Sequence, residues 1–220
     1  MIDVNGIMIS EVNRRSDVKT EVVEVKRSKK EMPAVVTIMF KPRGIVSQVM
    51  KTPVRPANSL LTTDTFASYI NGKSAHLDAI VKNKKIFFPL GSLEKEAHGL
   101  LVMTNDKKLI KKITNFEIYL EREFLIQLDK PLHKKFLEKI YKGSVMNEFL
   151  VKPKKIEMEG VSTMRLTLHT DFKNQIYQLI GRAGVKPLDI QCVRIGKFEI
   201  GTLKPGQWVV IEQLKEIIGR

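Results

Sequence analysis

The side chains in this sequence that could do chemistry are mostly cations, and they are clustered. The chain of 220 residues has a formal net charge of +14, from 38 Lys and Arg against 24 Asp and Glu. Thirteen of these cations and six of the acids fall between Lys107 and Ile156, which gives this segment a local charge of +7. Clustered Lys and Arg gain free energy by displacing counterions from phosphates. The charge therefore predicts a polyanionic partner, and a lysine-rich surface that only favours solubility is the alternative.

Several other kinds of site are excluded by the motifs that the sequence lacks. The single cysteine, Cys192, cannot form an internal disulfide, and the four histidines are too scattered for ligand spacing, so we expect no metal. The sequence contains no Gly-x-Ser-x-Gly, no Walker-type Gly-x-x-x-x-Gly-Lys-Ser/Thr and no Gly-x-Gly-x-x-Gly. Hydrolases and nucleotide-binding enzymes therefore have no motif here, and we expect no cofactor.

The elements that must position any site follow an α+β pattern, with many strands, few helices and varied connections. Pro33 marks a boundary between a polar segment, residues 1–32, and a main domain, residues 33–220. In the first segment, residues 4–6 predict a turn and residues 20–26 a short strand. The main domain has expected strands over 34–40, 84–93, 99–106, 122–128, 148–158 and 164–170, and expected helices over 106–114, 131–141, 172–182 and from about 212.

The expected helix over 106–114 has two different faces. Thr104 or Asn105 can cap its N-terminus, since either side chain accepts hydrogen bonds from the free N–H groups there. Leu109, Ile110 and Ile113 share the apolar face. The opposite face carries Lys107, Lys108, Lys111 and Lys112. This lysine face is either solvated or turned toward phosphates.

The sequence gives no sign of a membrane segment. No stretch approaches the ~18 consecutive apolar residues of a spanning helix. The first residues, MIDVNGIMIS, carry Asp3 and lack the basic flank and apolar stretch of a secretory signal. We therefore expect a cytoplasmic protein without a membrane partner, and a monomer.

Three sets of segments, in order, resemble a known family. These are FKPRGIVSQ (40–48), FPLGSLEKEAHGLLVMTNDKKL (88–109), and a third set made of EREFLIQLDKPL, KNQIYQLIGRAG and VRIGKFEIGTLKPGQW. They resemble the RsuA/RluB-type RNA pseudouridine synthases, which modify uridines in ribosomal RNA. The resemblance implies a pseudouridine synthase fold, a mixed and mostly antiparallel sheet with flanking helices and a central RNA-binding cleft. It also implies structured, ribosomal RNA as the partner.

Residues 1–32 are similar to the back half of the small S4 RNA-binding domain that many members of this family carry in front. The two helices with which that domain grips RNA are absent from this sequence. The segment is therefore either an S4-like remnant that contacts RNA or a plain N-terminal hairpin.

The resemblance places Glu94 at the position of the family's catalytic Asp. The extra methylene moves the carboxylate by more than about 1 Å, and a misplacement of about 1 Å can cost about 10²-fold in rate. Ser92 stands where the family has an arginine associated with base flipping. The resemblance thus implies that a carboxylate is kept while its neighbour changes.

Two further positions of the implied site differ from the family pattern. Phe124 replaces a tyrosine, so its ring can stack on uracil but has no hydroxyl for proton transfer. Tyr177 replaces the arginine that pairs with the catalytic Asp in the family, and Lys173, four residues away, could substitute for it. Without a cationic partner, the pKa of a buried carboxylate tends upward and its orientation is looser. These changes predict weak or absent catalysis at Glu94.

The KPRG turn supplies the remaining expected RNA contacts. We expect Lys41 and Arg43 to point outward on one lip of the cleft, with lysines of the 106–114 helix, the 131–141 helix and the 151–155 segment on the other. Three functions remain open: an RNA pseudouridine synthase acting through Glu94, a non-catalytic RNA-binding or ribosome-assembly factor on the same scaffold, and a basic protein-interaction module without an RNA role.

Overall fold

The chain divides into two units, Met1–Pro33 and Ala34–Arg220. The computed structural model describes residues 2–4, 7–9, 23–24, 32–48, 53–68, 74–115 and 120–211. In the first unit, strands β1 (Ile2–Val4), β2 (Ile7–Ile9) and β3 (Val23–Glu24) form an antiparallel sheet in the order β2-β1-β3. The predicted strand over 20–26 thus contains β3.

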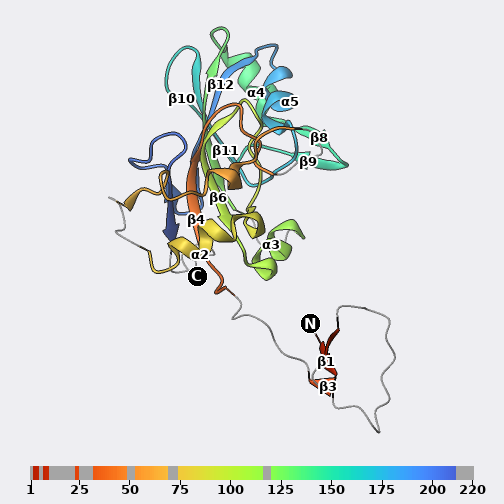
Figure 1. Ribbon diagram of the computed structural model, residues 1–220. Coiled ribbons are helices and arrows are strands. Elements are labelled where there is room, and N and C mark those ends of the chain that lie inside the picture. Colours follow the sequence, from red (N-terminus) through yellow and green to blue (C-terminus); the bar gives the residue numbers. More distant parts are fainter. Residues whose placement is uncertain are drawn as a thin grey trace. The chain divides into compact units, whose positions relative to one another are not determined.

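The second unit is built on one nine-stranded sheet, of which Figure 1 labels β4, β6, β10, β11 and β12. Its main path runs β10-β11-β7-β12-β6-β4-β14, with β13 paired to β12 and β5 to β6. The pairing is antiparallel throughout except between β12 and β6. The strands are β4 (Val36–Lys41), β5 (Phe88–Pro89), β6 (His98–Thr104), β7 (Arg122–Leu128), β10 (Lys155–Met158), β11 (Thr163–Leu168), β12 (Pro187–Ile195), β13 (Phe198–Glu199) and β14 (Trp208–Ile211).

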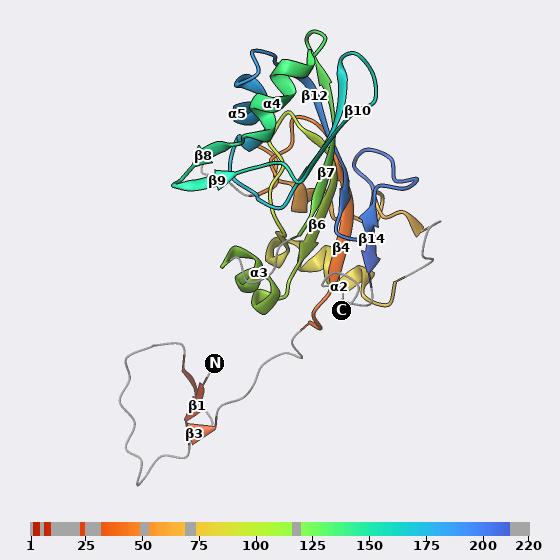
Figure 2. The ribbon, with the colours of Figure 1, turned by 180° about the vertical axis from the view of Figure 1, so that it is seen from behind.

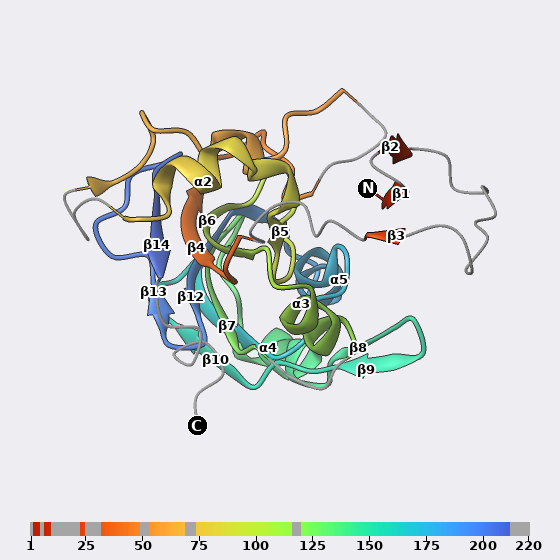
Figure 3. The ribbon, with the colours of Figure 1, turned by 60° about the horizontal axis from the view of Figure 1, so that its bottom comes forward.

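Three helices and a small hairpin lie to one side of this sheet (Figures 2 and 3). They are α3 (Lys107–Thr114), α4 (Lys134–Tyr141), α5 (Gln175–Gly181) and the pair β8 (Ser144–Met146) and β9 (Phe149–Val151). Helix α2 (Leu77–Lys82) and two 3-10 turns, η1 (Ala57–Leu60) and η2 (Lys84–Ile86), precede β5 in the chain. A mixed, mostly antiparallel sheet with flanking helices confirms the predicted α+β class.

Several element boundaries differ from the sequence prediction. The expected strand over 84–93 is replaced by η2 and the two-residue β5. Helix α3 is capped by Asp106, whose carboxylate accepts from the N–H groups of the second and third helical residues at 2.8 and 3.2 Å. Thr104 and Asn105 do not cap it, because both bond the backbone of Val35 instead.

The other two long helices begin later than predicted. Helix α4 starts at Lys134, three residues after Pro131. Helix α5 starts at Gln175, because Asn174 has a left-handed backbone with φ +57° that is not helical. The expected helix from about residue 212 lies outside the described residues.

Strand β7 has two chemically different faces. Its even-numbered side chains, Arg122, Phe124, Ile126 and Leu128, are buried, while the odd-numbered ones are half-buried or exposed. Successive side chains of a strand point to opposite faces. The buried face therefore joins the main core and, through its first two residues, the candidate site.

An irregularity in β12 brings an arginine to the other face. Cys192 pairs with Phe124 of β7, but Arg194 pairs with Glu123, because a β-bulge separates the two pairings. Cys192 is fully buried, and burial raises the pKa of its thiol to about 12. A bulge reverses which face the following residues occupy, so Arg194 joins the charged side chains rather than the core.

No helix among the described residues combines the length and the apolar character that crossing a membrane requires.

Candidate functional site

A small pocket lies where the turn after β5, strand β7 and the start of α5 meet. Its free volume of about 20 Å³ has room for about one water molecule. Three of the residues predicted from the sequence, Ser92, Glu94 and Phe124, line it together. The full lining is Ser92, Leu93, Glu94, Ala97, Phe124, Asp171, Phe172, Gln175, Ile176 and Ile190.

The backbone that carries Glu94 is fixed from several sides. The buried hydroxyl of Ser47 donates to the carbonyl of Leu93 at 2.9 Å and accepts from its N–H at 2.8 Å. The N–H of Gly44, in the KPRG turn, donates to the carbonyl of Lys95 at 2.9 Å. Backbone hydrogen bonds on both sides of Glu94 therefore define where its side chain begins.

A buried arginine fixes the backbone of the residues that precede Glu94. Arg122 is 3% exposed, and its guanidinium donates to the carbonyls of Leu90 at 3.0 Å and Ser92 at 3.2 Å. It also forms an ion pair with Asp171, whose other oxygen accepts from the N–H of Ser92 at 2.8 Å. The pair thus ties β7 to both the 90–92 turn and the loop before α5.

Gly91 makes this arrangement possible. Its φ is +100°, and a Cβ at this position would lie 1.0 Å from Nη2 of Arg122. No other residue type fits while the guanidinium stays where it is. The glycine in the Gly-Ser-Leu-Glu run is therefore required by the position of the arginine.

The start of α5 supplies the contact to Glu94 itself. The backbone N–H of Asn174 donates to the Glu94 carboxylate at 2.6 Å. The buried Gln175 holds the preceding loop, because its amide oxygen accepts from Thr170 Oγ1 at 2.8 Å and its amide nitrogen donates to the Thr170 carbonyl at 2.8 Å. Within the described part of the chain, Glu94 forms no ion pair.

Tyr177 lies close enough to Glu94 to feel its charge. Burial raises the pKa of the Tyr177 phenol, and the negative charges of Glu94 and Glu96 raise it further. Arg43 acts in the opposite sense on the same phenol, and its guanidinium forms an ion pair with Asp189. The structure therefore brings Glu94, Tyr177 and Arg43 into one neighbourhood, although Tyr177 does not line the small pocket.

The carboxylate of Asp189 is shared. It accepts from, or pairs with, His98 Nε2 at 2.9 Å as well as Arg43. The His98 ring in turn stacks on Phe40, with ring centroids 5.8 Å apart. This cluster anchors the outward-pointing arginine of the KPRG turn to β6 and β12.

The prediction that Lys41 points outward toward RNA is wrong. Its side chain is fully buried, and Nζ donates to the carbonyls of Ile45 at 2.7 Å, Pro42 at 3.0 Å and Lys95 at 3.4 Å. Burial lowers the pKa of Lys41 to about 8, and the charges of Glu96 and Glu94 partly offset this. Lys41 closes the KPRG turn against the Glu94 turn and cannot reach a phosphate.

The remaining predicted lysines are exposed. Lys173 lies on the loop before α5 and forms no ion pair with Glu94 or any other described residue. Lys107, Lys108, Lys111 and Lys112 occupy the exposed face of α3, whose apolar face packs on the core. The C-terminal end of α3 lines a second hollow of about 340 Å³ that shares Ser92 and Asp171 with the small pocket.

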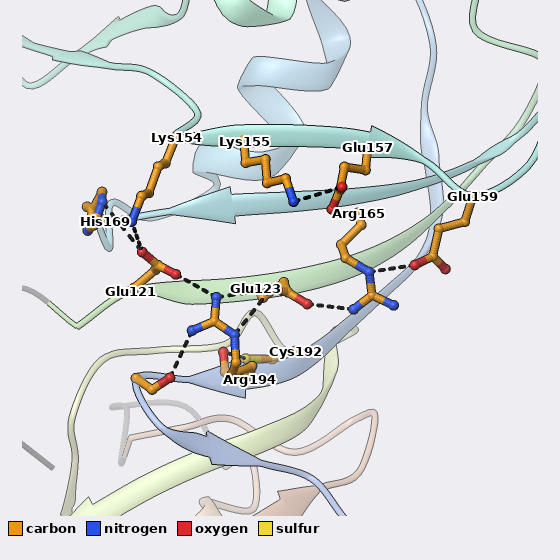
Figure 4. A network of polar contacts seen from close by, with 11 residues as sticks. Glu121, Glu123, Lys154, Lys155, Glu157, Glu159, Arg165, His169, Cys192 and Arg194 are labelled. Carbon is orange, nitrogen blue, oxygen red and sulfur yellow. Dashed lines mark hydrogen bonds and ion pairs between the residues drawn. The ribbon is translucent and has the colours of Figure 1, made fainter. Parts of the chain in front are cut away.

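A network of ion pairs covers the opposite, charged face of β7 (Figure 4). Arg194 pairs with Glu121 at 2.6 Å and with Glu123 at 3.0 Å, and Arg165 pairs with Glu123 at 2.6 Å. Lys154 pairs with Glu121 as well. Hydrogen bonds from Lys154 and Arg194 lower the pKa of Glu121 to about 2.

This network corrects one part of the predicted cleft. Lys154 and Lys155, in the 151–155 segment, pair with Glu121 and Glu157. They lie on the charged side of the sheet rather than around the pocket. Their charge is already compensated within the fold.

Sequence reasoning missed Arg122, Asp171, Gln175 and Ser47. Arg122 could have been found, because it shares the apolar side of an alternating strand with Phe124, Ile126 and Leu128, where an unpaired cation is not tolerated. Asp171 and Gln175 lie in a loop and a helix start with no distinctive pattern. Ser47 is one of many serines, and only its buried position reveals its role.

No group of three or more His, Cys, Asp or Glu side chains among the described residues is placed to hold a metal ion. The donors around the pocket are a glutamate, a glutamine, a serine and an ion-paired aspartate.

Comparisons with known proteins find RNA pseudouridine synthases among the proteins similar to this chain. No family model matches the sequence. The chain is 25% identical over 170 residues to the dual-specificity RNA pseudouridine synthase RluF of Escherichia coli (strain K12), covering 77% of this chain and 57% of that protein. It is 24% identical over 217 residues to an uncharacterized RNA pseudouridine synthase of Aquifex aeolicus (strain VF5), covering 96% of this chain and 80% of the relative.

A third relative is a putative chloroplastic ribosomal large subunit pseudouridine synthase, SVR1, of Arabidopsis thaliana. It is 24% identical over 222 residues, covering 96% of this chain and 52% of its own. This chain thus spans a little over half the length of the E. coli and Arabidopsis relatives. A crystal structure of a pseudouridylate synthase matches with a TM-score of 0.67 at 16% identity, covering 99% of this chain and 87% of the other. The predicted fold is confirmed.

Proposed function

Because the chain is related to the RNA pseudouridine synthases and has their fold, we propose that it binds structured RNA and isomerises a uridine through Glu94. The observation that carries this proposal is the position of the Glu94 carboxylate. It lines the small pocket beside Phe124, on a backbone held by Ser47, Arg122 and the KPRG turn.

The isomerisation needs few protein side chains. The bond between C1′ of the ribose and N1 of uracil breaks, the base turns, and a bond from C1′ to C5 replaces it. The proton on C5 leaves and N1 gains one, so no cofactor is consumed. Glu94 is the one carboxylate of the pocket that carries no ion pair among the described residues, since Asp171 is held by Arg122.

The target base must leave its stack to reach this pocket. Extruding a nucleotide costs a few kcal/mol, which contacts to the RNA backbone offset. The exposed lysines of α3 and Lys173 are groups near the site that can supply such contacts. Arg43 can add to them, because its guanidinium stays half-exposed although it pairs with Asp189. Phe124 supplies an aromatic face inside the pocket, where a base can stack.

The pocket must also open, because about 20 Å³ does not hold a uracil ring. Phe172 is the half-buried wall residue, and its outer partner is Phe149, 58% exposed on the β8–β9 hairpin, with ring centroids 5.8 Å apart. Movement of this ring pair would enlarge the pocket without disturbing the segment that carries Glu94.

A second candidate function is RNA binding without isomerisation, as in a ribosome-assembly factor. Two observations favour it. Glu94 has no cationic partner among the described residues, and Phe124 has no hydroxyl to move a proton. On this account the scaffold is kept for binding alone.

We propose ribosomal RNA as the substrate class and the cytoplasm as the compartment, for a monomer. The name of the Arabidopsis relative refers to the ribosomal large subunit, which supports ribosomal RNA. The positive charge supports an RNA partner in general.

The test is to map pseudouridine with carbodiimide in RNA from cells that lack this gene, before and after incubation with the protein. The proposal expects a new modified position with the wild type and none with Glu94→Gln. A variant that restores the family pattern, Glu94→Asp with Phe124→Tyr and Tyr177→Arg, should modify the same position faster.

Two results separate the candidates. Modification by the wild type that persists in Glu94→Gln would overturn the role of Glu94. The second candidate would be established if the wild type binds RNA without modifying it and only the triple variant produces a modified position.

A further inference from the structure

A third hollow, larger than the two beside Glu94, lies between α4 and the end of α5. Its volume is about 520 Å³, within the range of sites that hold a ligand of nucleotide size. It is lined by four basic side chains and by the glycine-rich turn that ends α5. The lining residues are Lys130, Pro131, His133, Phe136, Lys139, Gly181, Arg182, Ala183, Gly184 and Val185.

No carboxylate among the described residues neutralises the Lys and Arg side chains of this hollow. With respect to the other described residues, Lys130, Lys139 and Arg182 form no ion pair, and Arg182 donates only to the hydroxyl of Ser144 at 3.2 Å. Asp129, beside Lys130 in the chain, accepts from the backbone N–H of Lys186 at 2.8 Å. The positive charge of the hollow is thus left for a ligand.

The ring of Phe136 contacts two ammonium groups of α4. Lys135 Nζ and Lys139 Nζ each lie 5.1 Å from the centre of its ring, a distance typical of cation–π contacts. The ring itself packs on the core and lines the hollow. Of these two lysines, Lys139 lines the hollow. Its contact with the ring partly orders its side chain, which reduces the entropy that it loses when an anion binds.

Two glycines keep the floor of the hollow open. A Cβ added at Gly181 or Gly184 would meet no atom within 4 Å. Gly181 has an ordinary helical backbone, whereas the φ of Gly184 is +70°. A side chain at Gly181 would therefore enter free space without disturbing the fold.

The hollow is linked to the proposed active site by a single short helix. Gln175 and Ile176, at the start of α5, line the small pocket, and Gly181, at its end, lines the basic hollow. Seven residues of helix span about 10 Å, which is about three nucleotides at the 3.4 Å rise of a stacked strand. One RNA strand can thus reach both places.

We propose that this basic hollow binds the phosphodiester backbone of the RNA strand that flanks the uridine in the small pocket. The inference rests on the proposed function, since it takes the ligand to be the same RNA. Lys130, Lys139 and Arg182 contact the phosphates, and the imidazole N–H of His133 adds a hydrogen-bond donor at the rim. The hollow supplies affinity and register, while Glu94 and its pocket supply the chemistry.

The test uses the full chain and a fluorescent oligouridylate that is long enough to reach both pockets. Lys139→Gln with Arg182→Gln should weaken binding about tenfold at moderate salt. The slope of log affinity against log salt should fall by about 1.4, for two lost phosphate contacts on a single strand. Lys155→Gln, which removes a cation paired with Glu157 on the far face, is the matched control and should change neither value.

A second pair of variants distinguishes an effect of occupying the hollow from a loss of folding stability. Gly181→Glu should weaken binding more than Gly181→Gln, since both fill the hollow but only the first adds a negative charge. Both should unfold at or above the wild-type temperature, because a helical glycine costs up to about 1 kcal/mol relative to other residues.

The failures are distinguishable. If the wild type binds oligouridylate and the four substitutions in the hollow leave its affinity unchanged, the proposal is overturned and the proposed function stands. If the wild type binds no RNA, the proposed function fails and this site with it. If the same substitutions abolish binding of polyglutamate but not of RNA, the occupant is an acidic protein segment and the proposal is wrong.

Discussion

The two faces of strand β7 use charge in opposite ways. On the outer face, Glu121 and Glu123 meet Arg165, Arg194 and Lys154 in a network where each charge has a partner. On the inner face a single cation, Arg122, is buried and bonded to two carbonyls and to Asp171. The two arrangements alternate along the chain, since Arg122 lies between Glu121 and Glu123.

The difference shows what each face is for. The outer network is half-exposed, and exposed ion pairs contribute about 0 to 1 kcal/mol each. The inner pair is not replaceable by water, because it fixes the backbone of the segment that carries Glu94. The inner face positions the backbone segment that carries Glu94, whereas the outer face neutralises a sheet surface.

The largest expected effect follows from removing the inner cation. Arg122→Met removes the cationic partner of the Asp171 carboxylate and the donor to two backbone carbonyls, so we expect a loss of about 3 kcal/mol in the free energy of unfolding. Arg165→Met on the outer face should cost about 1 kcal/mol or less. Urea denaturation of both variants measures the two values. Equal losses would show that the faces do not differ as described.

A smaller effect isolates the geometry of the inner face. Gly91→Ala places a Cβ 1.0 Å from Nη2 of Arg122 and must displace the guanidinium. Gly44→Ala has a similar positive φ of +77° but meets no atom within 4 Å, so it measures backbone strain alone, about 1 kcal/mol. We expect Gly91→Ala to cost about 2 kcal/mol more than this control. Thermal unfolding of the two variants at one pH makes the comparison.

The smallest expected effect is the pH dependence of the stability that Glu121 contributes on the outer face. The folded-state pKa of Glu121 is lowered to about 2, so its contribution is complete above the unfolded pKa near 4.5 and is lost as the pH falls through 2. Glu121→Gln should be less stable than the wild type by about 1 kcal/mol near neutral pH, because a partly exposed pair is screened. The difference should vanish near pH 2. A difference that grows on acidification would contradict the assignment.

Much of the site could be predicted from the residues, and the failures have physical causes. The Gly-Ser-Leu-Glu run and the 122–128 strand located Glu94 and Phe124, which do share a pocket. Lys41 was misplaced because strand β4 is buried along its whole length, so alternation could not tell which way its last side chain points. Asp171 and Ser47 act through single hydrogen bonds to distant backbone, which no local pattern reports.

The helix cap shows the same limit on a smaller scale. Thr104, Asn105 and Asp106 are all good capping residues, and composition alone does not choose among them. The difference comes from Val35, the residue before β4, whose backbone forms hydrogen bonds with the side chains of Thr104 and Asn105. Tertiary contacts therefore decided what local preference left open.

The central claim is that Glu94 carries out chemistry on a bound uridine. It is tested most directly by tritium release from RNA that carries the label at C5 of uridine, since isomerisation expels this hydrogen. We expect tritium release by the wild type and none by Glu94→Gln. The RNA affinities of the two proteins should be equal within about twofold, because the Glu94 carboxylate does not bind a phosphate. Release at the same rate from Glu94→Gln, or none from wild type saturated with RNA, would contradict the claim.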